Sequence, residues 1–218
     1  MLLRLCSDTV NHFVCRILFY CQNVKYSTFK TNGLPFVSVA FGGKCTIGSE
    51  FIMNNNLRSN PIGRSQACVL FVDRDAELNI GNNVGISQTA IVCHLRISIG
   101  NNVKIGAGVC IYDTDFHSLN PEIRGNFKLD MDAKIKQPVI IKDNAFIGAH
   151  STILKGVTIG KNSVIGACSV VTKDVEDNEV WAGNPAKLVK KLPGFESIIK
   201  PLSNVVPEKQ INKPIEFS

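Results

Sequence analysis

One short segment, Ile111-Tyr-Asp-Thr-Asp-Phe-His-Ser118, places a histidine beside two carboxylates. A neutral imidazole can take a proton from a weakly acidic hydroxyl while that hydroxyl attacks a carbonyl carbon. A nearby carboxylate can orient the ring and stabilise the imidazolium that forms. We therefore predict His117 as a general base, oriented by Asp115 or Asp113. Either aspartate could instead hold the segment in shape through Asx turns.

The elements that must position this segment follow from a six-residue spacing. From residue 141 an aliphatic side chain recurs at every sixth position, and a small one recurs four places later. The aliphatics are Ile141, Ile147, Ile153, Ile159, Ile165 and Val171, and the later positions are Ala145, Ser151, Val157, Ser163 and Ser169. The same step runs through Cys93, Ile99, Ile105 and Ile111, and a third run, one residue out of phase, holds Ile80, Ile86 and Val92.

A helical period of 3.6 would drift out of phase within two of these repeats, so the spacing predicts short strands separated by turns. Three hexads make one triangular coil of a parallel β-helix, and each coil buries its aliphatics on the coil below. The step from Ile111 to Ile141 is thirty residues, a multiple of six. A loop at 113–138 can therefore leave the wall and return in register. The predicted fold class is all-β, a parallel β-helix with an extruded loop that carries His117.

The chain divides into three parts. Residues 1–30 contain apolar side chains three or four positions apart, which is typical of an amphipathic helix. This helix could pack on the β-helix or touch a membrane surface. Residues 31–192 form the β-helix domain, less regular before residue 80, and residues 193–218, with four prolines, form an extended tail. The helical spacing is carried by Leu3, Cys6, Val10, Phe13, Val14, Ile17 and Cys21.

Charge is concentrated at the two ends of the chain. Of the net charge of +6, residues 1–30 and 187–218 contribute +3 each, and the middle is neutral. Aromatic residues make up only 7% of the chain, and no basic stripe with interleaved aromatics appears, so a nucleic-acid partner is not expected. The basic ends suit a phosphorylated ligand or an anionic membrane, unless they are simply solvated. No apolar stretch reaches the ~18 residues of a membrane span.

These motifs resemble the hexapeptide-repeat acyltransferases, whose fold is a left-handed parallel β-helix. The likeness is greatest to sugar O-acetyltransferases of the maltose and galactoside type and to their relatives in capsule and O-antigen synthesis. It covers roughly residues 60–192. It is carried by Asn60-Pro-Ile-Gly63, Ile80–Ser87, Ile111–Ser118, Ile147–Ala149, Ile153–Gly160, Ser163–Ala167, Val171–Asp174 and Trp181-Ala-Gly-Asn-Pro-Ala186.

The resemblance implies acetyl-CoA as co-substrate and His117 as the catalytic base. Small residues at the donor groove would be Ala149 and Ala167, although turns of this fold favour small residues anyway. Thr172 and Lys173 would lie further along, and Lys173, Lys187 and Lys190 would meet the coenzyme phosphates. Trp181 could stack on the adenine or cap the last coil. Ser87 and His94 are the candidate acceptor contacts. The family works as homotrimers, which implies sites shared between subunits.

The function expected from this resemblance is O-acetylation of a sugar hydroxyl in polysaccharide biosynthesis, in the cytoplasm, with contact at the inner face of the membrane as an option. A non-sugar acceptor, a sugar amine or a catalytically silent scaffold are the alternatives. A γ-class carbonic anhydrase shares the fold but needs three histidines around zinc, two of them closely spaced. The four histidines here are 82, 23 and 33 residues apart, and no CxxC pair occurs among eight cysteines. We therefore expect no metal, and cysteines that stay reduced in the cytosol.

Overall fold

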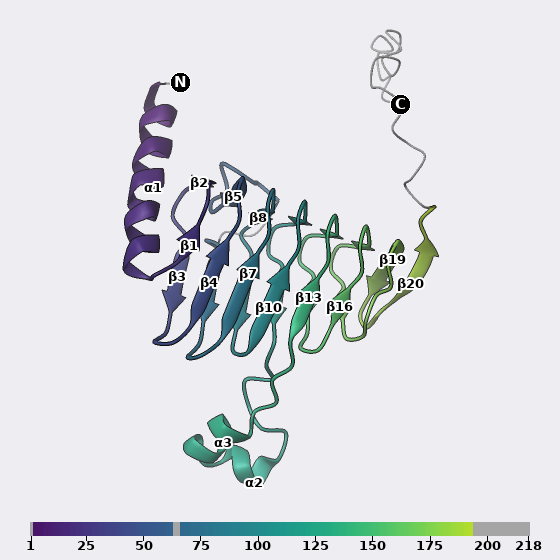
Figure 1. Cartoon of the computed structure of the whole chain (residues 1–218). Coiled ribbons are helices and arrows are strands. Elements are labelled where there is room, and N and C mark those ends of the chain that lie inside the picture. The colour runs from purple at the N-terminus through teal and green to yellow at the C-terminus, as the bar shows by residue number, and fades with distance from the viewer. Residues whose placement is uncertain (1, 63–65, 194–218) are drawn as a thin grey trace, which may run out of the picture.

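The computed structural model describes residues 2–62 and 66–193, which form a parallel β-helix with a helix at its N-terminal end (Figure 1). The left-handed β-helix expected from the repeats and the resemblance is confirmed. Gly63 of the Asn-Pro-Ile-Gly motif and the predicted tail from residue 194 onward lie outside the described residues.

Three sheets form the walls of the β-helix, and the strands of each wall come from successive coils. In spatial order, sheet A holds β1 Lys25–Tyr26, β4 Lys44–Ile47, β7 Glu77–Ile80, β10 Arg96–Ile99, β13 Val139–Ile141 and β16 Thr158–Ile159. Sheet B holds β2 Phe29–Asn32, β5 Phe51–Asn54, β8 Gly85–Ser87, β11 Lys104–Ile105, β14 Phe146–Ile147, β17 Val164–Ile165, β19 Glu179–Gly183 and β20 Ala186–Lys191. Sheet C holds β3 Phe36–Val39, β6 Val69–Val72, β9 Ala90–Cys93, β12 Cys110–Tyr112, β15 Thr152–Ile153 and β18 Val170–Val171.

The core is built from three stacks of aliphatic side chains, one behind each wall. Parallel pairing puts equivalent residues of successive coils opposite one another, so each aliphatic packs on the next. The stacks are Ile80–Ile99–Ile141–Ile159 in sheet A, Ile86–Ile105–Ile147–Ile165 in sheet B and Ile91–Ile111–Ile153–Val171 in sheet C. All of these side chains are buried.

One inward position differs from the sequence prediction. Ile91, not Val92, points into the core and pairs with Ile111, whereas Val92 pairs with Tyr112 and is only half-buried. The turn between Ile86 and Ile91 is one residue shorter than a hexad. A residue lost from a turn shifts the next strand by one position, which exchanges its inner and outer faces.

The corners of the β-helix need residues that tolerate a left-handed backbone or a close neighbour. Asn102, Asn144 and Asn162 follow one another on the corner between sheets A and B, each with a φ near +60°. Their side-chain amides donate along the corner, from Asn102 to Asn144 over 3.2 Å and from Asn144 to Asn162 over 2.9 Å. Glycine is needed at position 148 because of a close neighbour: a Cβ there would lie 2.5 Å from the backbone nitrogen of Ala167 in the next coil.

Helix α1, Leu2–Cys21, stands along the N-terminal end of the β-helix (Figure 1). Its inner face buries Cys15 and Phe19, and the Phe19 ring lies 4.9 Å from that of Phe29. The helix therefore covers the open edge that the first coil would otherwise present. It ends at Cys21, and the first strand begins at Lys25, so the β-helix starts before the predicted boundary at residue 30.

Four of the apolar positions that predicted an amphipathic helix lie on the face of α1 that points away from the β-helix. Val10, Phe13, Val14 and Ile17 are exposed, and so is Cys21. The side chains of Leu3 and Cys6 lie outside the described residues. Helical spacing identifies a stripe but does not say which neighbour it meets. Within residues 2–62 and 66–193, no helix is long and apolar enough to cross a membrane.

Candidate active site

The chain leaves the β-helix after β12 and returns at β13, and this excursion extends away from the wall (Figure 1). It carries two short helices, α2 Pro121–Arg124 and α3 Phe127–Ala133. Asn126 caps α3 by accepting the backbone N–H groups of Lys128 and Leu129, at 3.1 and 3.2 Å. This cap fixes where α3 starts and therefore which of its side chains faces back toward residues 116–118.

The side chain that α3 brings to His117 is Asp130. The His117 Nδ1 and the Asp130 Oδ2 are 2.7 Å apart, and the Asp130 Oδ1 accepts the Ser118 backbone N–H over 2.6 Å. The Asp130 side chain is 5% exposed, whereas that of His117 is 63% exposed. The His117 ring and the Ser118 N–H hold the pKa of Asp130 below its usual value. An ionised Asp130 accepts the Nδ1–H, which leaves Nε2 unprotonated and able to take a proton.

The residue before His117 adopts an unusual backbone. Phe116 has a φ of +64°, a region that bulky side chains rarely enter. Its ring is held in place by edge contacts with Tyr112 at 5.2 Å and His94 at 5.8 Å between centroids. Its backbone N–H also donates to the Thr114 hydroxyl over 3.2 Å. Backbone strain that the surroundings enforce is found preferentially at functional sites.

The prediction that Asp113 or Asp115 orients His117 is wrong for this structure. Asp113 is buried, and its two oxygens accept the backbone N–H groups of His94, Leu95 and Arg96 at 2.7 to 2.8 Å. It thus holds a turn of the neighbouring coil. Asp115 forms an ion pair with Lys155 of the following coil, at 2.7 Å. Both carboxylates are used to attach the start of the excursion to the wall.

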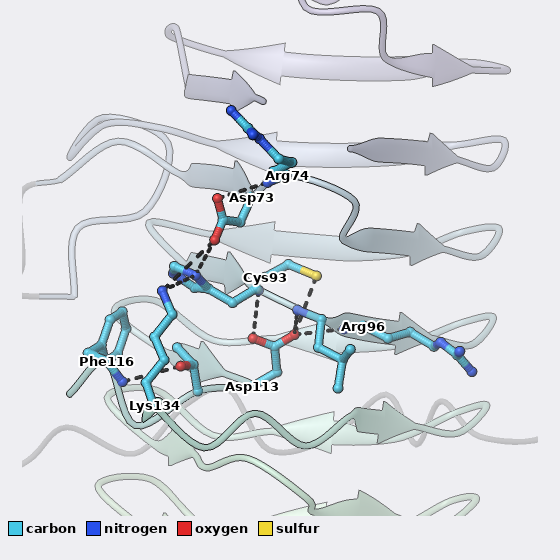
Figure 2. A network of polar contacts seen from close by, with 10 residues as sticks. Asp73, Arg74, Cys93, Arg96, Asp113, Phe116 and Lys134 are labelled. Atoms are coloured by element: carbon cyan, nitrogen blue, oxygen red, sulfur yellow. Dashed lines mark hydrogen bonds and ion pairs between the residues drawn. The ribbon is translucent and has the colours of Figure 1, made fainter. Parts of the chain in front are cut away.

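A polar network holds the end of the excursion against the same wall (Figure 2). The Lys134 side chain, only 10% exposed, lies 4.0 Å from the Asp73 carboxylate and 3.2 Å from the His94 Nδ1. The His94 Nδ1 lies 2.7 Å from Asp73 Oδ2. Burial lowers the pKa of His94, and the Lys134 charge lowers it further, so the ring is neutral at pH 7 and donates to Asp73.

The predicted acceptor contacts are both largely buried. His94 is 11% exposed and belongs to the network that anchors the excursion. The Ser87 hydroxyl is buried and accepts a hydrogen bond from the Asn54 amide at 3.1 Å. Their exposure gives no support to acceptor binding, which stays a prediction for these two residues.

The predicted donor residues fall into three groups. Ala149 and Ala167 stand one coil apart on the corner between sheets B and C, where the Cys168 N–H donates to the Ala149 carbonyl over 2.8 Å. Thr172 and Lys173 are exposed at the opposite end of β18. That end adjoins the corner from which the excursion leaves, two strands away in sheet C.

The remaining donor candidates come together on the last hairpin. Strands β19 and β20 pair in antiparallel fashion, which places Lys187 opposite Ala182 and Lys190 opposite Val180, both lysines exposed. Trp181 packs partly buried against the core and donates from Nε1 to the Glu179 carboxylate over 2.8 Å. The capping role considered for Trp181 is therefore seen, and its contact with adenine stays a prediction.

Neither of two cavities at the N-terminal coils contains a predicted site residue. The first measures about 480 Å³ and is lined by residues between Cys21 and Thr46. The second measures about 350 Å³ and is lined by residues between Thr28 and Asn83. Within the part of the chain described, no group of three histidine, cysteine or acidic side chains could hold a metal ion.

Sequence reasoning missed Asp130, Lys134 and Asp73. Asp130 is thirteen residues after its histidine, and only the fold of α3 brings the two together. Asn126 is a signal that could have found Asp130. An asparagine of this kind predicts the start of a helix inside the excursion, and such a helix favours an acidic residue in its first turn.

Comparison with known proteins extends this description. Residues 138–173 match the family described as bacterial transferase hexapeptide (six repeats). The chain is 44% identical over 121 residues to protein CapG of Staphylococcus aureus, covering 53% of this chain and 63% of CapG. It is 35% identical over 129 residues to the galactoside O-acetyltransferase of Escherichia coli strain K12, and the match covers 56% of this chain and 61% of that protein. The chain thus spans less than two thirds of the length of these curated relatives.

The fold is also found in a solved structure. A hexapeptide-repeat containing acetyltransferase from Vibrio cholerae O1 biovar eltor, complexed with acetyl coenzyme A, has a TM-score of 0.53, with 21% identity and 88% of each chain covered. The family match, the curated relatives and this shared fold confirm the resemblance of the chain to the hexapeptide-repeat acyltransferases.

Proposed function

We propose that this protein is an acetyl-CoA-dependent O-acetyltransferase that modifies a sugar hydroxyl in the synthesis of a capsule or O-antigen polysaccharide. The observation that carries the proposal is the His117–Asp130 pair on the excursion. An exposed imidazole whose Nδ1 is held by a buried carboxylate is the arrangement that general-base catalysis on a hydroxyl requires. The similarity to the galactoside O-acetyltransferase of Escherichia coli supports the choice of acceptor class.

The chemistry assigned to the residues is direct transfer. A bound acetyl thioester would supply an activated carbonyl carbon. His117 Nε2 takes the proton of the acceptor hydroxyl as the new C–O bond forms, and Asp130 stabilises the imidazolium across the 2.7 Å hydrogen bond. His117 then returns that proton to the departing sulfur as the C–S bond breaks, so the protein ends the cycle unchanged.

The donor would lie along the corner that carries Ala149 and Ala167, with its phosphates near Lys173, Lys187 and Lys190. Small side chains at this corner let a ligand approach the wall, and exposed ammonium groups attract phosphate as point charges. Lys187 and Lys190 of the hairpin pair with the two neighbours of Trp181, Ala182 and Val180. We propose a homotrimer in which the excursion of one subunit faces the donor corner of the next.

A cytoplasmic location is part of the proposal. It is supported by the seven cysteines whose side chains are described, all of which are free thiols, five of them buried or half-buried. Such thiols persist in a reducing compartment.

The test is acetyl-CoA turnover over a panel of sugars and nucleotide sugars, followed by thiol release, with the native protein beside His117→Ala. Loss of a general base predicts a drop of about 10²–10⁴-fold in acceptor-dependent turnover, with coenzyme binding retained. Turnover that survives in His117→Ala would refute the assigned base. Failure of the native protein to bind the coenzyme would refute the transferase and favour a scaffold.

A further inference from the structure

The outer face of α1 carries a continuous apolar stripe that no described residue covers. Its members are spaced three or four apart, and their exposed fractions are high, at 63% for Phe13 and 85% for Tyr20. We call this set the outer stripe: Val10, Phe13, Val14, Ile17 and Tyr20. By contrast, the face toward the β-helix fully buries only Cys15 and Phe19 among the helix residues whose side chains are described.

This stripe is more than a scatter of surface apolar residues. Single exposed apolar side chains are normal, but five on one helix face form a contiguous patch, which in soluble proteins marks an interaction surface. Another exposed aromatic side chain lies near the end of α1. Phe41 is 91% exposed, and it lines a cavity of about 480 Å³ together with Cys21 at the end of α1.

The charge along this part of the sequence is mainly of one sign. Residues 8–50 contain four basic side chains and two acidic residues, Asp8 and Glu50 at the two ends. All four, Arg16, Lys25, Lys30 and Lys44, are exposed, and Lys25 and Lys44 line the same cavity as Phe41. Arg16 lies on α1 itself, one position before Ile17 of the stripe. An exposed apolar helix face with an excess of cationic groups near it is typical of helices that lie in the interface of an anionic bilayer.

We propose that α1 docks on an anionic lipid bilayer, with the outer stripe and Phe41 in the interfacial layer and the four basic side chains toward the headgroups. The helix lies along the surface, because no described helix is apolar enough to span it. A second copy of the chain fits less well. A symmetric contact through this face would bring together two sets of the four basic side chains, which outnumber the acidic ones there. The proposal does not depend on the enzymatic activity.

The test is co-sedimentation of the full chain with vesicles of phosphatidylcholine containing about 30% phosphatidylserine, compared with phosphatidylcholine alone. We expect the native chain to pellet with the anionic vesicles and to be released by salt. Phe13→Ser with Ile17→Ser should lower the partition coefficient by at least about tenfold. Arg16→Gln with Lys25→Gln should lower it by on the order of twentyfold, since one basic residue contributes about fivefold.

The control is Phe127→Ser, an equally exposed aromatic on α3 at a distant part of the molecule (Figure 1), which should bind vesicles as the native chain does. Circular dichroism and light scattering on each variant check fold and oligomeric mass. A native chain that stays in the supernatant would overturn the proposal. A stripe variant that pellets as well as the native chain would do the same. A stripe variant that changes the oligomeric mass, with no vesicle binding by the native chain, would assign the face to a contact between copies.

Discussion

Replacement of Asp130 by asparagine separates the orienting role of this carboxylate from its role in shaping the excursion. Asparagine has the same size and keeps a carbonyl oxygen that can accept the Ser118 N–H, now at 2.6 Å. The other end of the side chain becomes an NH2 group facing His117 Nδ1 across the present 2.7 Å contact. An amide donor there favours the tautomer with Nδ1 unprotonated and the proton on Nε2, where the base must be free.

The size of the effect follows from burial. In serine proteases the same change in the triad lowers kcat by about 10⁴-fold, because the histidine is held in the wrong tautomer. Here the carboxylate is equally enclosed, at 5% exposed, but the histidine is 63% exposed, so water can compete for the ring nitrogens. We therefore expect Asp130→Asn to lower kcat by about 10²–10³-fold, equivalent to about 2.7–4 kcal/mol of transition-state stabilisation. KM for the donor should change little.

The assay is steady-state thiol release with the acceptor identified from the sugar panel, at several pH values. The matched control is Asp132→Asn, an exposed carboxylate two positions further along the same helix, which should leave kcat unchanged. A purely structural role for Asp130 would instead be seen as a lower melting temperature with near-native kcat in the folded fraction. A folded Asp130→Asn protein with kcat within threefold of native, roughly 0.7 kcal/mol, would refute the tautomer argument.

Two further predictions concern stability, measured by urea unfolding. Asn144→Ala should lower the free energy of unfolding by about 2–3 kcal/mol, because it removes two side-chain hydrogen bonds along the corner and leaves a residue with a Cβ at a φ of +61°. Asn144→Gly removes the same hydrogen bonds but fits this φ, so it should cost about 1 kcal/mol less. Equal losses for the two variants would show that backbone strain plays no part. Glu179 has its pKa lowered by the Trp181 N–H, so its contribution is present above its unfolded value of about 4.5 and is lost as pH falls through the lower folded value. The native protein should therefore exceed Glu179→Gln in stability at pH 7, and this advantage should shrink as the pH falls below about 4.5; a difference independent of pH would contradict this.

The fold could be predicted because the six-residue period reports directly on which side chains face inward. Burial of Ile99, Ile141 and Ile147 is a local property of short strands, and it repeats whenever the turn length repeats. Prediction failed where the turn length changed, since the shorter turn after Ile86 moved Ile91 rather than Val92 into the core. For α1 the sequence predicted the helix but left open whether it packs on the β-helix or touches a membrane, because an apolar stripe does not identify the surface that it meets.

The candidate site was predictable in part. His117 could be identified because it lies in an excursion between strands that keep the six-residue register. Its exposure agrees with a side chain available to a ligand. Its partner was sought among neighbours in the sequence, Asp113 and Asp115. Residues at the end of a strand point where the strand directs them, which for these two is toward adjacent coils. The actual partner depends on the packing of a helix that the six-residue pattern does not describe.

Three of the carboxylates of the excursion, Asp113, Asp115 and Asp130, show why the pair must be assembled away from the wall. Asp113 uses both oxygens on three backbone N–H groups, and Asp115 is paired with a lysine, so a histidine held by either would leave the wall without its anchor. Within the described part of the chain, the hydrogen bonds of the Asp130 side chain reach only His117 and Ser118, both in the excursion. The geometry of the pair is therefore set within the excursion, and changes in the coil core should alter stability before they alter the orientation of His117.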